Sequence, residues 1–347
     1  MRWTVAGAGN SGVKRSALAL AILLVVVLLL VAICARAPHF TGIPNSTGQS
    51  AILPVTAPGS NGTIHAAEPQ AAPGSSLTFP EENRTGLVTR SFPYVLRGET
   101  GTVNASLSSA MYSELAAEVP PEMCSPDNAT VPCTHEVFSR FYLNMVNEPD
   151  ENGTLDALVD AIREKTPVRD DQARIAISLV QQIPYGYHPS SGGGNGSMRY
   201  PVMILSDDNG LCDEKAVLLA SLLQRLGYGT ALLDFSSDNH MVLGIQSPAA
   251  YAYNNSGYAF VETTIPLIVT DDQEFYNGGG RLAGVPDIYP VSDGASFDSV
   301  SEEYLDAREF IRLTKSGRYT GSGLRASDDP VLQPLVQKYG LNLSQAA

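Results

Sequence analysis

The chain is poor in tryptophan, cysteine and basic residues. Its 347 residues include one tryptophan, Trp3, four cysteines, and 22 lysines and arginines against 36 aspartates and glutamates. Residues 1–36 contain four of the basic residues and no acidic one, so the remainder carries 18 basic against 36 acidic residues, a formal charge of −18. That sign excludes binding to nucleic acid, or to an anionic membrane, through a basic face.

Cofactor motifs are also missing. The glycine run 278–280 lacks the Lys-Ser/Thr of a phosphate loop, and residues 207–210 lack the ligand spacing of a calcium loop. Cys124, Cys133 and His135 lack the closely spaced cysteine pair of tetrahedral zinc sites. We therefore expect neither a metal nor an organic cofactor.

One long apolar run lies near the N-terminus. Residues 17–35 are apolar throughout apart from Cys34, close to the ~20 residues that span a bilayer as a helix. Arg2, Lys14 and Arg15 precede the run, and only Arg36 follows it closely, which predicts a cytoplasmic segment 1–16, a transmembrane helix and an extracytoplasmic remainder. The alternative is a signal peptide cleaved after the small-x-small pattern at residues 35–37.

Nine Asn-x-Ser/Thr sequons follow this run and none precedes it, which makes a glycosylated surface protein plausible. The asparagines are Asn45, Asn61, Asn83, Asn104, Asn128, Asn152, Asn195, Asn254 and Asn342. Cys124 and Cys133 are close enough in sequence to close a disulfide loop, and disulfides persist outside the cytosol. Cys212 then remains as the one unpaired thiol of the exported part.

Composition divides the exported part into segments. Residues 36–90 are rich in Pro, Gly, Ser and Thr and predict a disordered linker. Residues 91–167 predict strands over 91–107, with a turn at 97–99, and then three helices and the cysteine loop. The predicted helices cover residues 111–117, 135–146 and 154–164.

Residues 168–268 hold the most regular patterns. Helices are predicted over 170–183 and 212–226. The second has an apolar face made of Ala216, Leu219, Leu222, Leu223 and Leu226. Strands are predicted over 230–235, 241–245 and 258–262. This order indicates an α+β fold, a central helix packed on a small antiparallel sheet. Residues 269–347 predict a C-terminal extension that packs on this core.

The candidate catalytic groups include the thiol of Cys212, at the start of the predicted helix 212–226. A helix N-terminus carries free N–H groups and a partial positive charge, which favour a thiolate. His240 and Glu262 follow in the sequence, where they would start one strand and end the next. A thiol, an imidazole and a carboxylate are the groups of a nucleophile, a base and an orienting acid.

These blocks resemble the transglutaminase-like superfamily of cysteine proteases and transferases. The resemblance lies in Gly210-Leu211-Cys212 before a Leu-rich helix, in His240-Met241, and in the strand ending at Glu262, with residues 183–185 and 199–201 as the lead-in. It implies a papain-like core in which Cys212 attacks an amide carbonyl, His240 is the base and Glu262 orients it.

Two features depart from the family pattern. Glu262 stands where the family usually has Asp, which leaves Asp234 and Asp238 as alternative orienting residues. Asp213 and Glu214 directly follow the nucleophile, and their negative charges oppose a lowered thiol pKa. Gln181, Gln182, Tyr185 and Tyr200 are the candidates for the second oxyanion donor, beside the backbone N–H of Cys212.

Two functions follow. The first is a membrane-anchored extracytoplasmic thiol enzyme that hydrolyses or transfers an amide or peptide acyl group of a peptide or protein substrate at the cell surface. The second is a non-catalytic module of the same fold that binds peptide or glycan, with Cys212 as a small buried hydrophobe. The glycine-rich segment 190–197 would be either a lid over the site or a plain surface loop.

Overall fold

The computed structural model describes residues 86–118, 133–186, 198–273, 282–315 and 329–342. The chain divides into two compact units, and all described residues belong to the second, Ser75–Ala347. The apolar run 17–35, Cys124 and the segment 190–197 lie outside the described residues, so the predictions made for them remain predictions. No helix in the described ranges has the length and apolar composition required to cross a membrane.

A β-hairpin opens the described part. Strands β1 (Leu87–Leu96) and β2 (Glu99–Ser108) pair antiparallel through a two-residue turn. Arg97 and Gly98 both have positive φ, as the tight turn that suits the strand twist requires. The predicted strands and turn are confirmed. The first strand begins at Leu87, before the predicted Ser91, because the regular pairing of the hairpin extends that far.

Helices make up most of the described residues between 109 and 225. Their bounds are α2 Ser109–Ala117, α3 His135–Val146, α4 Asn152–Arg163, α5 Arg169–Gln182, α6 Pro201–Asp207 and α7 Cys212–Arg225, with a short 3-10 turn, η2, at Pro149–Glu151. Side-chain caps start two of them: Ser108 accepts from Met111 N and Thr134 from Val137 N. Helix α6 was not predicted, because it is too short to show a clear helical period.

The main sheet has four antiparallel strands in the order β5-β4-β3-β6. Their bounds are β3 Thr230–Phe235, β4 His240–Gln246, β5 Tyr258–Val261 and β6 Asp287–Ser292. Strands β3, β4 and β5 confirm the prediction, and β6 lies in the C-terminal extension. It pairs with β3, so the sheet takes its outer strand from beyond residue 268.

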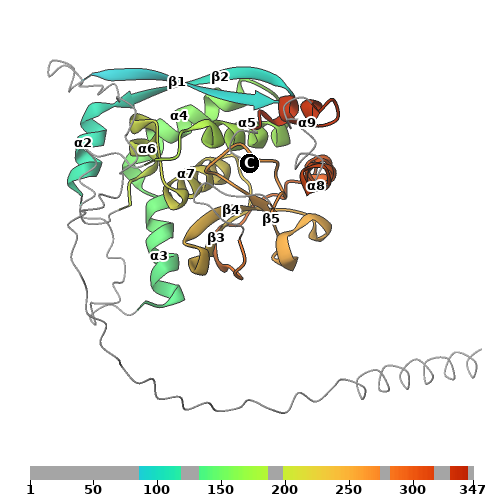
Figure 1. Cartoon of the computed structure of the whole chain (residues 1–347). Helices are drawn as coiled ribbons and strands as arrows, with labels where there is room; N and C mark the ends of the chain where they lie inside the picture. Colours follow the sequence, from blue (N-terminus) through green and yellow to red (C-terminus); the bar gives the residue numbers. More distant parts are fainter. Residues whose placement is uncertain (1–85, 119–132, 187–197, 274–281, 316–328, 343–347) are drawn as a thin grey trace, which may run out of the picture. The chain divides into compact units, whose positions relative to one another are not determined.

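Helix α7 lies in the middle of the fold (Figure 1) and contacts the sheet through β3 and β4. Helices α3, α4, α5 and α6 pack around it, and the hairpin lies over α4 and α5. The predicted apolar face is buried, but so are Val217, Leu218 and Ala220 on the other sides. A helix that is apolar all round is a buried core helix rather than a surface one. The α+β arrangement of a central helix on an antiparallel sheet is therefore confirmed.

The C-terminal part contributes α8 (Ser301–Lys315) and α9 (Leu332–Tyr339). These helices share a small apolar cluster with Ile268, separate from the main core. Polar contacts join them to the rest of the fold: Gly98 N donates to Lys338 O at 3.0 Å, and the guanidinium of Arg174 pairs with Glu303.

Candidate active site around Cys212

Cys212 is the first residue of α7 and a free, half-buried thiol. A parallel bridge between Tyr185 and Gly210 sets the position of the chain before it, with Gly210 N donating to Pro184 O and Gly186 N to Gly210 O, both at 3.2 Å. A Cβ at Gly210 would come within 3.0 Å of the side chains of Ile204 and Lys215, so the glycine permits this close approach. The thiol therefore lies at a fixed helix N-terminus, as the sequence predicts.

His240 opens β4, directly after a left-handed turn at Asn239, and pairs with Phe235 across β3. Its ring is almost completely buried. His240 Nε2 lies 2.8 Å from Glu262 Oε2, and the side chains of Cys212 and Glu262 both hydrogen-bond the ring. Since Nε2 faces Glu262, Nδ1 remains for the thiol. The structure thus brings the three predicted residues together.

Glu262 follows the last residue of β5 and is buried. Its Oε1 atom accepts hydrogen bonds from Thr263 N at 2.9 Å, from Thr264 N at 2.7 Å and from Thr264 Oγ1 at 2.7 Å. Burial alone would raise the pKa of this carboxyl, but His240 and Thr264 outweigh burial and lower it. Glu262 therefore remains ionised and holds the imidazole by its other oxygen.

Burial by itself lowers the pKa of His240, because a charged imidazole loses water. The hydrogen bonds and charges of Cys212 and Glu262 act in the opposite direction and are stronger, so the pKa is raised to about 9. The ring is accordingly protonated at neutral pH. An imidazolium beside a thiol stabilises the thiolate, which is the nucleophilic form of cysteine.

The alternative orienting residues bond elsewhere. Asp234 accepts from Ser236 Oγ at 3.1 Å, and Asp238 accepts from Gly284 N at 2.9 Å and from Ser237 Oγ at 3.2 Å. Glu262 is thus the carboxylate on the Nε2 side of the ring.

The acidic residues after Cys212 behave differently from each other. Glu214 forms a buried, bidentate pair with Arg199, with Oε1 3.0 Å from Nε and Oε2 2.7 Å from Nη2, and it also accepts from Leu211 N. Arg199 therefore compensates its charge. Burial, and then the charge of Glu214, raise the pKa of Asp213 to about 6, so a negative charge beside Cys212 persists at neutral pH.

The structure separates the four candidate oxyanion donors. The side-chain amide nitrogen of Gln181 donates to the carbonyl oxygens of residues 262 and 267, both at 2.9 Å. The side chain of Gln182 extends toward Gly340. The hydroxyl of Tyr200 hydrogen-bonds Glu118. Tyr185 remains as the candidate. Burial, followed by the charge of Cys212, raises the pKa of its hydroxyl, which therefore stays a proton donor.

Sequence reasoning did not single out Lys215, three residues after Cys212. Its side chain is completely buried, and Nζ donates to the carbonyls of Ile183 and Thr264. Burial lowers its pKa to about 7. A lysine at the edge of an apolar helix is an ordinary sequence feature, so only the neighbouring loops reveal this role.

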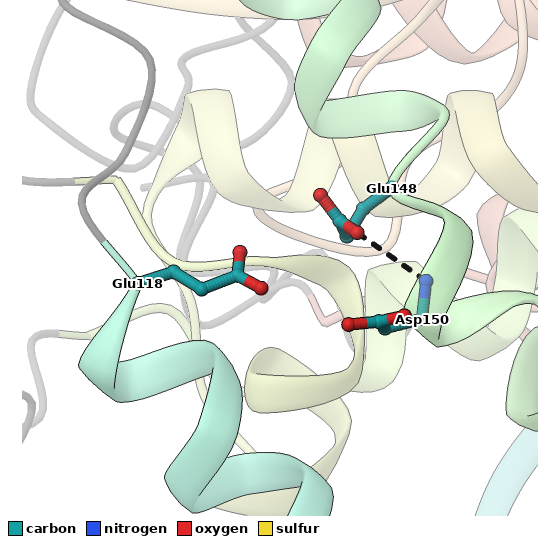
Figure 2. A group of neighbouring side chains, drawn as sticks. All are labelled: Glu118, Glu148 and Asp150. Atoms are coloured by element: carbon teal, nitrogen blue, oxygen red, sulfur yellow. Dashed lines mark hydrogen bonds between the residues drawn. The ribbon is translucent and has the colours of Figure 1, made fainter.

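Three carboxylates converge away from these residues, at the end of α2 and in the connection from α3 to α4 (Figure 2). Ligand oxygens of Glu118, Glu148 and Asp150 lie within 4.8 Å of one another, and Glu148 Oε1 accepts from Asp150 N at 3.3 Å. Burial and the two neighbouring charges raise the pKa of Glu148. Such oxygens suit a hard cation, and the sequence offered no motif for this group.

His135 contacts Ile288 O through Nε2 at 3.0 Å and stacks on Tyr289.

No protein-family model matches the chain, and no curated protein matches it. Among solved structures, calcium-bound LapG of Legionella pneumophila is similar, with 15% identity over 50% of this chain and 98% of that one, at a TM-score of 0.25. A candidate protease from Parabacteroides distasonis is 11% identical over 61% of this chain and 43% of that one, at a TM-score of 0.28. At these TM-scores the case for a function rests on the site geometry.

Proposed function

We propose that the chain is a transglutaminase-like thiol enzyme that cleaves or transfers an amide or peptide acyl group through Cys212. The observation that carries the proposal is the buried His240–Glu262 pair, hydrogen-bonded to a free thiol at the N-terminus of α7. A buried ion pair is a poor source of stability because both charges lose their water. The presence of this ion pair beside a half-buried thiol is better explained by a role in catalysis than by a role in stability.

The reaction follows from these groups. The thiolate of Cys212 attacks the amide carbonyl carbon, and the carbonyl electrons move to oxygen. Backbone N–H of Cys212 and the hydroxyl of Tyr185 are the donors available to that oxyanion. When the tetrahedral species collapses, the C–N bond breaks and the His240 imidazolium gives its proton to the leaving amine. Water or a second amine then attacks the thioester, with His240 as the base.

Hydrolysis is the default outcome, because water is always present. We also propose that the enzyme is anchored by residues 17–35 and acts outside the cytoplasm on a peptide or protein at the cell surface. The apolar run, its flanking basic residues and the sequons support that placement. The four sequon asparagines within the described residues, Asn104, Asn152, Asn254 and Asn342, are all exposed.

The test measures the rate of Cys212 alkylation by iodoacetamide against pH in the full-length chain, with peptide mass spectrometry to separate Cys212 from Cys34. An activated pair gives an apparent pKa at least about one unit below the free-thiol value of about 8.5. His240→Ala should abolish that activation and Glu262→Gln should weaken it. Asp234→Asn is the matched control, because it removes a carboxylate of the adjacent strand that bonds Ser236.

An ordinary thiol in the wild type, indifferent to His240, would contradict the enzyme. The ionised Asp213 beside Cys212 gives that outcome a physical basis. The chain would then be a binding module of the same fold, and the search would turn to peptide or glycan partners.

A further inference from the structure

The buried Lys215 side chain connects the three segments that form the site. Its ammonium nitrogen donates to Ile183 O, directly before the Pro184-Tyr185 segment, and to Thr264 O at 3.2 Å, two residues after Glu262. Its aliphatic stem packs against Gly210, two residues before Cys212. One side chain thus contacts the chain leading to the thiol, the chain leading to Tyr185 and the chain holding Glu262.

A cation is unfavourable in this position unless its hydrogen bonds and nearby charges compensate for the water that it loses. Lys215 lies in the first turns of α7, where the helix dipole is positive, and its side chain has no exposed surface. Burying an unpaired charge is costly. Partial compensation comes from the carbonyl of Ile183 at the C-terminal end of α5, where the helix dipole is negative, and from the charge of Glu262.

Thr264 transmits the contact to the imidazole. Its N–H and hydroxyl both donate to Glu262 Oε1 while its carbonyl accepts from Lys215, and Glu262 Oε2 in turn holds His240 Nε2. Without Lys215, the segment after β5 would lose this hydrogen bond to α7. The donors that hold Glu262 would then be free to shift relative to Cys212.

We infer that Lys215 is a positioning residue for the active site, which ties the Glu262-Thr263-Thr264 segment and the Ile183-Pro184-Tyr185 segment to the helix that carries Cys212. This inference rests on the proposed function for its catalytic meaning, but the contact it describes exists whether or not Cys212 reacts. Lys215 acts through Thr264 and Glu262 and touches neither substrate nor the reacting atoms.

The test compares Lys215→Met, which keeps the stem and removes the donor, with the wild type in the full-length protein labelled with [15N]histidine. Loss of the Lys215 charge by itself would raise the pKa of His240, because that charge is coupled to Glu262. We expect the displacement of Glu262 to outweigh this effect and to lower the pKa of His240, followed by its ring nitrogen signals, by about one unit, a tenfold change in imidazolium population. The apparent pKa of Cys212 alkylation should rise toward the free-thiol value in the same variant.

Ser221→Ala is the matched control. Ser221 is another buried polar residue of α7, but its hydroxyl bonds Val146 O and Val217 O, away from the site. This variant should lower the melting temperature and leave the His240 titration unchanged. If Lys215→Met does not fold, Lys215→Gln, which retains an amide donor, is measured in the same way and should give a smaller shift of the same sign.

The outcomes separate the two proposals. A folded Lys215 variant with the wild-type His240 pKa would overturn the positioning role while leaving the enzyme intact. A His240 shift in Lys215→Met, together with an ordinary wild-type thiol, would support the positioning role and reject the enzyme. An equal His240 shift in Ser221→Ala would reduce Lys215 to a general contributor to stability.

Discussion

At the residue scale, Glu262 shows how a glutamate can do the work expected of an aspartate. The extra methylene carries the carboxylate far enough from the strand for Oε1 to accept three hydrogen bonds from residues 263 and 264, while Oε2 meets His240. The sequence identified Glu262 as the acid, but the anchoring by Thr264 depends on how the chain turns after β5. The departure from Asp is therefore compensated locally.

Replacing Glu262 by Gln should cost most stability between pH 4.5 and 6.5. The folded pKa of Glu262 lies below 4.5, and that of His240, about 9, lies above 6.5. The carboxyl contribution is present above 4.5 and lost as pH falls through the folded pKa. The imidazole contribution is full below 6.5 and lost as pH rises through about 9. We expect a loss of about 3–5 kcal/mol in that window.

Urea unfolding of wild type and variant across the pH range measures this difference. The loss of stability caused by Asp234→Asn should show no maximum between pH 4.5 and 6.5, because burial raises the pKa of Asp234 instead of lowering it. A wild-type advantage over Glu262→Gln that stays flat from pH 4.5 to 9 would show that the two side chains do not form an ion pair.

At the element scale, the N-terminus of α7 is held by a polar network invisible in the sequence. Arg199 binds Glu214 through two of its nitrogens and also contacts Asp207 and Asn209, at 2.8 and 3.0 Å. The sequence counted Glu214 as a charge opposing the thiolate. The structure adds a guanidinium beside that carboxylate, from a segment separated from the helix by α6, and only the tertiary structure brings the two together.

Arg199→Met should destabilise the fold by about 3–5 kcal/mol, because it leaves the carboxylate of Glu214 buried without its partner. Chemical denaturation measures the loss. Arg312→Met, which breaks an exposed pair with Glu309 on α8, should leave the unfolding midpoint within error of the wild type. Equal behaviour of the two variants would mean that the Arg199 network does not hold α7.

The elements that the sequence predicted share a simple cause. Helix α7 and strands β3, β4 and β5 are short apolar segments that are buried almost throughout. Cys212 and His240 begin two of them, and Glu262 directly follows a third. Helix α6 is too short to show a period. The burial of Lys215 is set by residues 183 and 264, which lie far from it in sequence.

At the scale of the whole molecule, the apolar side chains form separate clusters. The largest contains α7 and the helices around it, and a smaller one joins α8, α9 and Ile268. The ion pairs Arg174–Glu303 and Arg97–Glu302 join α8 to the rest of the fold, and Lys338–Glu302 joins α9 to α8. The sequence predicts that this C-terminal part packs on the core. The apolar pattern within one segment cannot reveal which residues of other segments form ion pairs with it.

Amide hydrogens of α9 should exchange faster than those of α7, because a short helix on a small cluster opens without global unfolding. Hydrogen exchange followed by mass spectrometry measures both. Leu335→Ala should accelerate exchange in α9 and leave α7 unchanged. Equal rates in the wild type would show that the clusters unfold as one unit.

The thiol, the imidazole and the carboxylate come from a helix start, a strand start and a strand end. In a nascent chain, long stretches of sequence separate them, and Cys212 is an ordinary thiol. Burial and ion pairing arise only when α7 docks on the sheet. The activated thiol that we propose would therefore exist only in the folded protein, where the three segments come together.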